Sequence, residues 1–125
     1  MKKPLEILLV EDHYIMRKLV ETYLSKNHVV YSECNGIEAI KWLESENSKP
    51  DIIIVDLSMP ELDGQGFIEY VKSTEFYNHI PIIIISGNDE ITLKGLADDY
   101  LTKPFNPIDL DEKIAKLTAK KIVYI

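Results

Sequence analysis

The sequence predicts an α/β protein built on a doubly wound, five-stranded parallel sheet. Short runs of branched apolar residues recur along the chain without alternation of apolar and polar positions, and a helix-like pattern follows each of them. The chain has 125 residues, 46% of them hydrophobic. That length is enough for one domain with its own core and too short for two.

The first part of the chain predicts two strand–helix units. Residues 5–10 form a short apolar run, and residues 29–31 form a second, β-branched one. After the second run, Asn35 is placed as the N-cap of a helix and Glu38 as its capping acid. After the first run, six apolar residues recur at the spacing of one helix face: Ile15, Met16, Leu19, Val20, Tyr23 and Leu24.

The third and fourth strands are predicted at residues 51–55 and 80–85. The first of these ends in Ile-Ile-Ile-Val, and the second ends in four consecutive isoleucines. Between them, Phe67, Ile68 and Val71 have the spacing of a helix face. Continuous branched runs are typical of strands buried on both faces, which occur in parallel sheets covered by helices.

The fifth unit is a weaker strand at residues 100–102 followed by a helix. Asn106 and Pro107 suit an N-cap and a first helical turn, and Leu110, Ile114 and Leu117 follow on one face. Short loops and right-handed crossovers then indicate a flavodoxin-like sheet in strand order 2-1-3-4-5. We expect one domain over residues 1–125, with 121–125 either extending the last helix's core contact or beginning a linker.

Charge and cysteine content narrow the class of protein. The chain has 14 Lys and Arg against 21 Asp and Glu, a net charge of −7. This argues against direct binding of nucleic acid or of an anionic membrane, and favours a cation or a basic partner. Cys34 alone cannot form an intrachain disulfide, and no long apolar segment or leader is present. We therefore expect a soluble, cytoplasmic protein.

Polar residues follow the predicted strands, where ligands of such sheets bind. They are Glu11 and Asp12 after the first strand, Asp56 after the third, Ser86 after the fourth and Lys103 after the fifth. Clustered carboxylates repel one another unless a cation lies between them, and an all-oxygen set favours Mg²⁺. A lysine and a hydroxyl are the groups that a transferred phosphoryl needs, which makes Asp56 a candidate nucleophile.

Each of these residues also has an ordinary structural interpretation. Glu11 and Asp12 can simply be acids in the first turn of a helix. Asp56 and Lys103 can be solvated loop residues, and Ser86 can belong to a turn. The convergence of all five on one sheet edge argues against these interpretations.

The motifs together resemble the receiver domain of two-component response regulators. The resemblance rests on the acidic pair Glu11-Asp12, an Asp-x-x-Met-Pro-x-x-Asp-Gly loop at residues 56–64, Ser86, and Asp-Asp-Tyr-Leu-Thr-Lys-Pro-Phe at 98–105. These motifs occur in the family's order along essentially the whole chain.

The resemblance implies that Asp56 accepts a phosphoryl group from a phosphohistidine of a sensor histidine kinase or histidine phosphotransfer protein. It also implies that Asp12, Asp56 and the backbone carbonyl of Ser58 bind Mg²⁺, while Glu11 acts through a metal-bound water. Lys103 would then pair with the phosphoryl oxygens, and the Lys103–Pro104 bond resembles the family's cis peptide.

Ser86 and Tyr100 correspond to the family's conformational switch, with output through a downstream protein target. Such a domain is a signalling module rather than a metabolic enzyme, because it catalyses only its own phosphorylation and dephosphorylation. The main alternative is a receiver that acts by protein contact without phosphorylation. An aspartyl phosphatase of the dehalogenase type would need a second Asp two residues after Asp56, where this chain has Ser58.

One stretch departs from the family pattern. The segment at residues 87–97 is shorter than the corresponding segment of a typical receiver. Between Asn88 and Gly95 there are too few residues for two helical turns. We therefore expect the fourth helix to be shortened or irregular.

Overall fold

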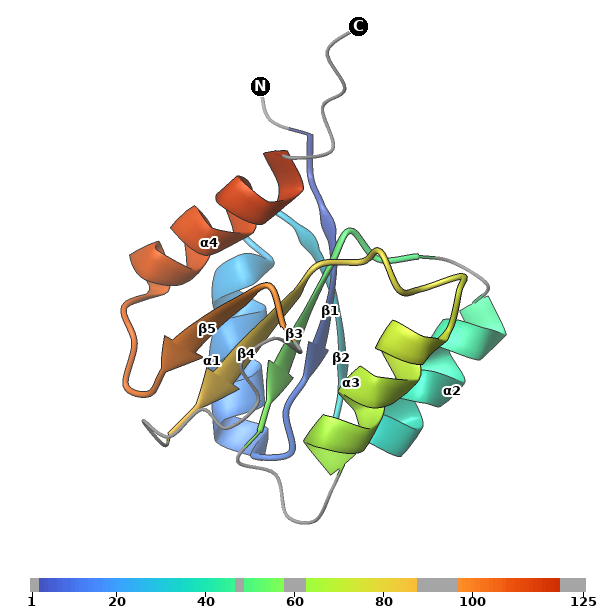
Figure 1. Cartoon of the computed structure of the whole chain (residues 1–125). Helices are drawn as coiled ribbons and strands as arrows, with labels where there is room; N and C mark the ends of the chain where they lie inside the picture. Colours follow the sequence, from blue (N-terminus) through green and yellow to red (C-terminus); the bar gives the residue numbers. More distant parts are fainter. Residues whose placement is uncertain (1–2, 47–48, 58–62, 88–96, 120–125) are drawn as a thin grey trace, which may run out of the picture.

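The computed structural model describes residues 3–46, 49–57, 63–87 and 97–119 (Figure 1). Five strands pair in one parallel sheet in the order β2-β1-β3-β4-β5, as predicted. The strands are β1 (Glu6–Val10), β2 (Val29–Glu33), β3 (Ile52–Asp56), β4 (Ile82–Ser86) and β5 (Asp99–Thr102). Their bounds differ from the predicted ones by one or two residues. One consequence is that Asp56 and Ser86 are the last residues of their strands.

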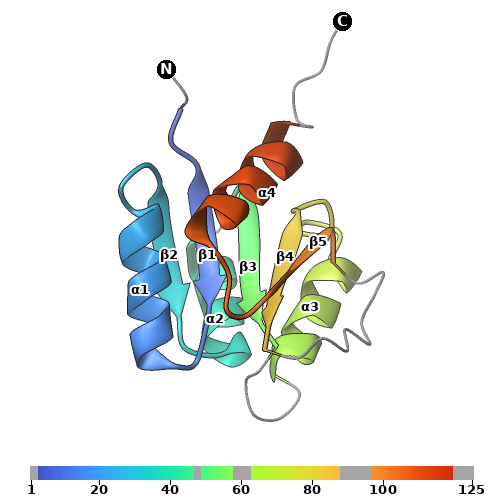
Figure 2. The same cartoon turned by 90° about the vertical axis from the view of Figure 1, so that its left-hand side faces the viewer.

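Four helices cover the sheet in the part of the chain that the structure describes: α1 (Tyr14–Leu24), α2 (Gly36–Glu46), α3 (Asp63–Ser73) and α4 (Pro107–Ala119). Helices α1 and α4 lie on one face, and α2 and α3 lie on the other (Figures 1 and 2). The doubly wound architecture is therefore confirmed. The expected short helix falls mainly on residues 88–96, and the expected linker on 121–125. Both stretches lie outside the described residues.

Alternate residues of the central strands supply the two halves of the core. Leu8, Ile53 and Ile84 belong to the cluster that packs with α2 and α3. Ile7, Ile54 and Ile83 belong to the cluster that packs with α1 and α4. Because both sets are fully buried, these strands need apolar residues at every position, which accounts for the continuous isoleucine runs.

The predicted helix N-caps at Asn35 and Asn106 are confirmed. The Asn35 side-chain oxygen accepts from the Glu38 backbone N–H at 2.8 Å, and that of Asn106 accepts from Ile108 at 3.0 Å. Each satisfies one of the N–H groups that a helix leaves unpaired at its start. Helix α1 has a histidine cap, since Nδ1 of His13 accepts from the Met16 N–H at 3.3 Å.

The six apolar residues that have the spacing of one helix face all lie in α1, but the sheet covers only part of that face. Val20 and Leu24 are buried, whereas Ile15 is 63% exposed and Leu19 62%. The six positions span a wider part of the helix surface than the part that packs against the sheet. The uncovered residues, with Tyr14, form an apolar surface that begins just after the end of β1.

Helix α3 begins in close contact with the end of β3. A Cβ atom added at Gly64 would lie 3.1 Å from the backbone oxygen of Asp56 and 3.0 Å from a side-chain carbon of Leu57. A Cβ at Gly66, two residues further along the same helix, would meet nothing within 4 Å. Gly64 therefore allows α3 to approach the chain that carries Asp56, while Gly66 has no such role.

We predict opposite effects for alanine at these two glycines. Gly64→Ala should lower the free energy of unfolding by about 1–3 kcal/mol, because backbone atoms must move to admit the methyl group. Gly66→Ala should raise it by about 0.5–1 kcal/mol, since alanine is the better helix former and meets no obstacle. Urea unfolding of both variants measures the difference. Equal effects would show that α3 does not need the close approach.

Candidate functional site

The carboxyl ends of the strands lie at one edge of the sheet and bring the predicted polar residues to it (Figure 1). Strand β1 pairs with β3, β3 with β4, and β4 with β5, all in parallel. As a result Asp56 ends β3 beside Ile85, and Ser86 ends β4 beside Thr102. Lys103 follows directly, and its N–H donates to the Ser86 carbonyl at 2.8 Å.

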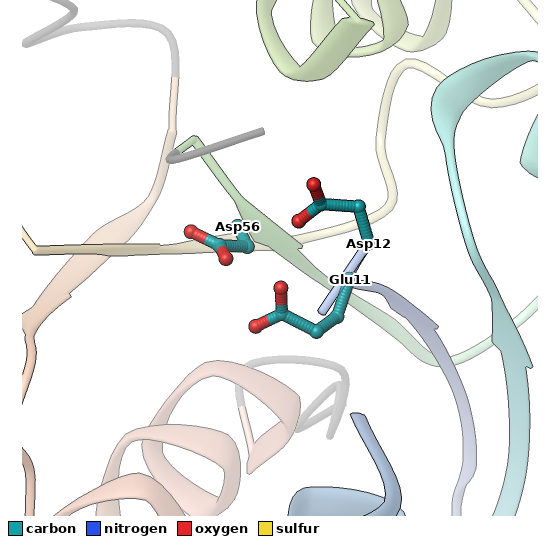
Figure 3. Close-up of side chains that lie close together, drawn as sticks. All are labelled: Glu11, Asp12 and Asp56. Atoms are coloured by element: carbon teal, nitrogen blue, oxygen red, sulfur yellow. The ribbon is translucent and has the colours of Figure 1, made fainter. Parts of the chain in front are cut away.

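Three carboxylates converge at this edge (Figure 3). Glu11, Asp12 and Asp56 each offer an oxygen within 4.8 Å of the others. Glu11 is 1% exposed and Asp56 2%, while Asp12 is open to solvent. Buried like charges at this spacing are unfavourable without a nearby cation. The cluster therefore suits a hard divalent ion, which would enter from the solvent side at Asp12.

Lys103 supplies a positive charge to the two buried carboxylates. Its ammonium group donates to Oδ2 of Asp56 at 2.7 Å and to Oε1 of Glu11 at 3.3 Å. Burial alone would lower the pKa of Lys103, but the hydrogen bond and charge of Asp56, together with Glu11, raise it above its ordinary value. The ammonium therefore stays charged within reach of the nucleophile candidate.

Glu11 responds to the same crowding by holding a proton. Burial raises its pKa from 4.5 to about 8, and the hydrogen bond and charge of Asp56 add to the shift. The His13 N–H, which donates to Oε2 at 3.2 Å, and the Lys103 charge both act in the opposite direction. Without a metal ion, Glu11 is therefore protonated at neutral pH, whereas a bound cation would favour its ionised form.

The structure places most, but not all, of the remaining features predicted for the site. Ser86 is buried at the end of β4, at the same edge. Tyr100 is half-buried in β5 and packs against the core cluster of α2 and α3. The Lys103–Pro104 peptide bond is cis, as the resemblance implied. Ser58, the expected carbonyl ligand, lies outside the described residues.

Two residues beside the site were not anticipated. Gly64 lies against the backbone of Asp56, although in the sequence it is only the last residue of the loop motif at residues 56–64. Arg17 of α1 donates from Nη1 to the Glu11 carbonyl at 2.8 Å. Arg17 lies one helical turn after the N-cap residue His13. An arginine on a helix is usually solvated, so the sequence does not indicate this contact.

Comparison with known proteins identifies the class. The response regulator receiver domain family matches residues 7–115. The chain belongs to this family, and it is a receiver domain of two-component systems. The family match confirms the resemblance that the sequence motifs indicated. Receiver domains are signalling domains rather than classical enzymes.

Individual relatives agree with the family. The chain is 34% identical over 115 residues to ycf27 of Guillardia theta, a protein named as a transcriptional regulator. The match covers 87% of this chain and 43% of that protein, so the chain spans less than half of its relative's length.

Solved structures of receiver domains share the fold. The signal receiver domain of a signal transduction histidine kinase from Syntrophus aciditrophicus has a TM-score of 0.83 and 29% identity, covering 97% of this chain and 96% of that one. The receiver domain of the sensor histidine kinase PA1611 from Pseudomonas aeruginosa PAO1 has a TM-score of 0.79 and 28% identity, covering 94% and 99%. That structure is described with a magnesium ion coordinated in its active site cleft.

No helix within the described ranges is long and apolar enough to cross a membrane.

The protonation of Glu11 predicts a pH-dependent stability. Because the folded-state pKa of about 8 exceeds the ordinary 4.5, the folded domain holds a proton that the unfolded chain releases, and stability falls as pH rises between these values. Without Mg²⁺, Glu11→Gln should therefore be more stable than the wild type at pH 8, by about 1–2 kcal/mol, and gain less at pH 5. Urea unfolding at both pH values measures this.

The exposed Glu112→Gln on α4 is the matched control and should leave the pH dependence unchanged. A wild type and a Glu11→Gln variant with parallel stability curves from pH 5 to pH 8 would contradict the assignment of the proton to Glu11.

Proposed function

We propose that Asp56 is the phosphoacceptor of a Mg²⁺-dependent phosphorelay reaction. The observation that carries the proposal is the environment of its carboxylate. It is buried at the end of β3, two further carboxylates lie within 4.8 Å, and the Lys103 ammonium lies at 2.7 Å. A nucleophilic carboxylate, a metal-binding pair and a mobile cation are the groups that phosphoryl transfer to an aspartate requires.

The donor set fits Mg²⁺. Asp12 and Asp56, joined by the Ser58 carbonyl, would hold the ion, and Glu11 would act through a bound water. All these donors are oxygens, as Mg²⁺ prefers, and the exposed Asp12 leaves a side open for waters and phosphoryl oxygens. Bound there, the ion would neutralise negative charge on the carboxylates and on the incoming phosphoryl group.

The chain's own residues account for the transfer. A carboxylate oxygen of Asp56 attacks phosphorus as the bond between phosphorus and the donor histidine nitrogen breaks, which leaves an acyl phosphate. The histidine leaves as a neutral imidazole when its other ring nitrogen carries a proton in the phosphorylated donor. The Lys103 ammonium, which donates a hydrogen bond to Asp56 Oδ2 in the structure, moves to a phosphoryl oxygen. The Ser86 hydroxyl donates to another. Attack by water on phosphorus later breaks the bond between phosphorus and the carboxylate oxygen, releases inorganic phosphate and a proton, and restores the Asp56 carboxylate.

Ser86 and Tyr100 form the proposed switch. The Ser86 hydroxyl would follow the phosphoryl group, and Tyr100, now half-buried against the core, would turn inward into the space that Ser86 leaves. The charge and acceptor oxygens added at Asp56 would favour this second arrangement.

The proposed partners are a sensor histidine kinase or histidine phosphotransfer protein as donor and a downstream protein as target. The donor must bring its phosphohistidine to the open side of the site, at Asp12. Helix α1 begins two residues later, and its first residues, Tyr14 and Ile15, are exposed. Lys26 borders the same apolar surface, which suits a donor surface with acidic residues. We propose that residues 1–125 form one receiver domain, which acts in the cytoplasm and does not itself bind nucleic acid or membrane.

The alternative, a receiver that acts without phosphorylation, is not favoured. It would not need Asp56 and Lys103 in contact, nor the costly burial of two carboxylates beside a third.

Incubation with acetyl phosphate and Mg²⁺, followed by intact-mass measurement, tests the proposal. The wild type should gain one phosphoryl group, and Asp56→Asn should gain none, because an amide cannot act as the nucleophile. Asp109→Asn, at an exposed position of α4, is the matched control and should be modified like the wild type. Modification of Asp56→Asn, or no modification of the wild type at any Mg²⁺ concentration, would refute the assignment.

A further inference from the structure

Arg17 reaches from α1 back to the loop that carries the acidic pair. Its Nη1 donates to the backbone oxygen of Glu11 at 2.8 Å and lies 3.5 Å from that of Asp12. The guanidinium carbon is 5.5 Å from the centre of the Tyr14 ring. The side chain is partly buried, so it is held between a ring and two carbonyls rather than solvated.

These contacts complete the anchoring of a three-residue connection, residues 11–13, between β1 and α1. The Glu11 N–H donates to the Glu33 carbonyl of β2 at 3.1 Å, and the His13 N–H donates to the Glu11 carboxylate at 3.2 Å. The Arg17 guanidinium donates a hydrogen bond to the Glu11 carbonyl. With both sides of this backbone held, the directions in which the Glu11 and Asp12 side chains leave the chain are fixed toward Asp56.

The positive charge of Arg17 also acts at this corner of the sheet. Burial and the charge of Glu38 raise the pKa of Glu33, and Arg17 lowers it in opposition. Arg17 is therefore a cation shared between the ends of β1 and β2, whereas Lys103 approaches the same carboxylate cluster from β5. Both carbonyl contacts come from Nη1 of the planar, rigid guanidinium, and the flexible stem of a lysine does not hold its ammonium in the same position.

We propose that Arg17 is a positioning residue of the metal site: it holds the backbone of Glu11 and Asp12 so that their carboxylates meet Asp56 in the arrangement that binds Mg²⁺. This inference rests on the proposed function. Arg17 contacts the loop backbone and plays no direct part in the phosphoryl transfer.

Three variants test the proposal. Arg17→Met keeps much of the apolar stem and removes the donors, Arg17→Lys keeps the charge and a single donor group, and Lys18→Met removes a neighbouring exposed cation that pairs with Glu21 instead. Isothermal titration calorimetry gives the Mg²⁺ dissociation constant, and urea unfolding without Mg²⁺ gives the stability. The rate of phosphorylation by acetyl phosphate is measured at saturating Mg²⁺.

Arg17→Met should weaken Mg²⁺ binding about tenfold and Arg17→Lys about threefold, as for other residues that orient metal ligands. Lys18→Met should leave the affinity unchanged. At saturating Mg²⁺ all three should be phosphorylated at the wild-type rate, because the nucleophile and Lys103 are intact.

Wild-type Mg²⁺ affinity in Arg17→Met, even with lower stability, would overturn the proposal, because Arg17 would then be merely structural. An equal loss of affinity in Lys18→Met would also overturn it, because charge alone would explain the effect. If Arg17→Met does not fold, Arg17→Lys decides in the same way. A wild type that binds no Mg²⁺ would instead refute the metal role in the proposed function.

Discussion

Three carboxylates share one edge of the sheet, and two of them are buried. In water such a cluster would disperse; here the ends of β1 and β3 hold Glu11, Asp12 and Asp56 within 4.8 Å. Repulsion and lost hydration make this unfavourable unless positive charge is supplied. The surrounding structure supplies it through the Lys103 ammonium and through a proton on Glu11. A bound divalent cation would replace the proton on Glu11, and a phosphoryl group would draw the Lys103 ammonium away from Asp56. The unfavourable electrostatics of the cluster and its proposed reactivity therefore have one origin.

The rest of the fold holds that cluster in place. The isoleucine strands form a core on both faces of the sheet, which leaves little freedom for the strand ends to separate. Gly64 allows α3 to lie against the backbone of Asp56, and Arg17 ties α1 to the backbone of Glu11. The helices on opposite faces thus each support one of the two segments that carry the carboxylates, the end of β3 and the connection that follows β1. A site of this precision depends on such supports as much as on the residues that react.

Much of this was predictable from the sequence, and the exceptions have physical reasons. Continuous isoleucine runs predict buried parallel strands because few other environments tolerate them, and the strand ends then place Asp56 and Lys103 together. The exposure of Ile15 and Leu19 was not predictable, since helical spacing does not say how much of a stripe the sheet covers. The contact of Arg17 and the proton on Glu11 depend on tertiary proximity and burial. The shortened helix at residues 87–97 and the carbonyl of Ser58 stay predictions.

We propose that the carboxylate cluster is a cation site that serves phosphoryl transfer. A crystal structure of the protein with Mn²⁺ in place of Mg²⁺ tests it most directly, because the anomalous signal locates the ion independently of the surrounding density. We expect one strong peak within coordinating distance of the Asp12 and Asp56 carboxylates, with the ion balancing part of the Asp56 charge that Lys103 otherwise balances. An empty cluster at saturating Mn²⁺, or an ion bound only elsewhere on this acidic surface, would contradict it.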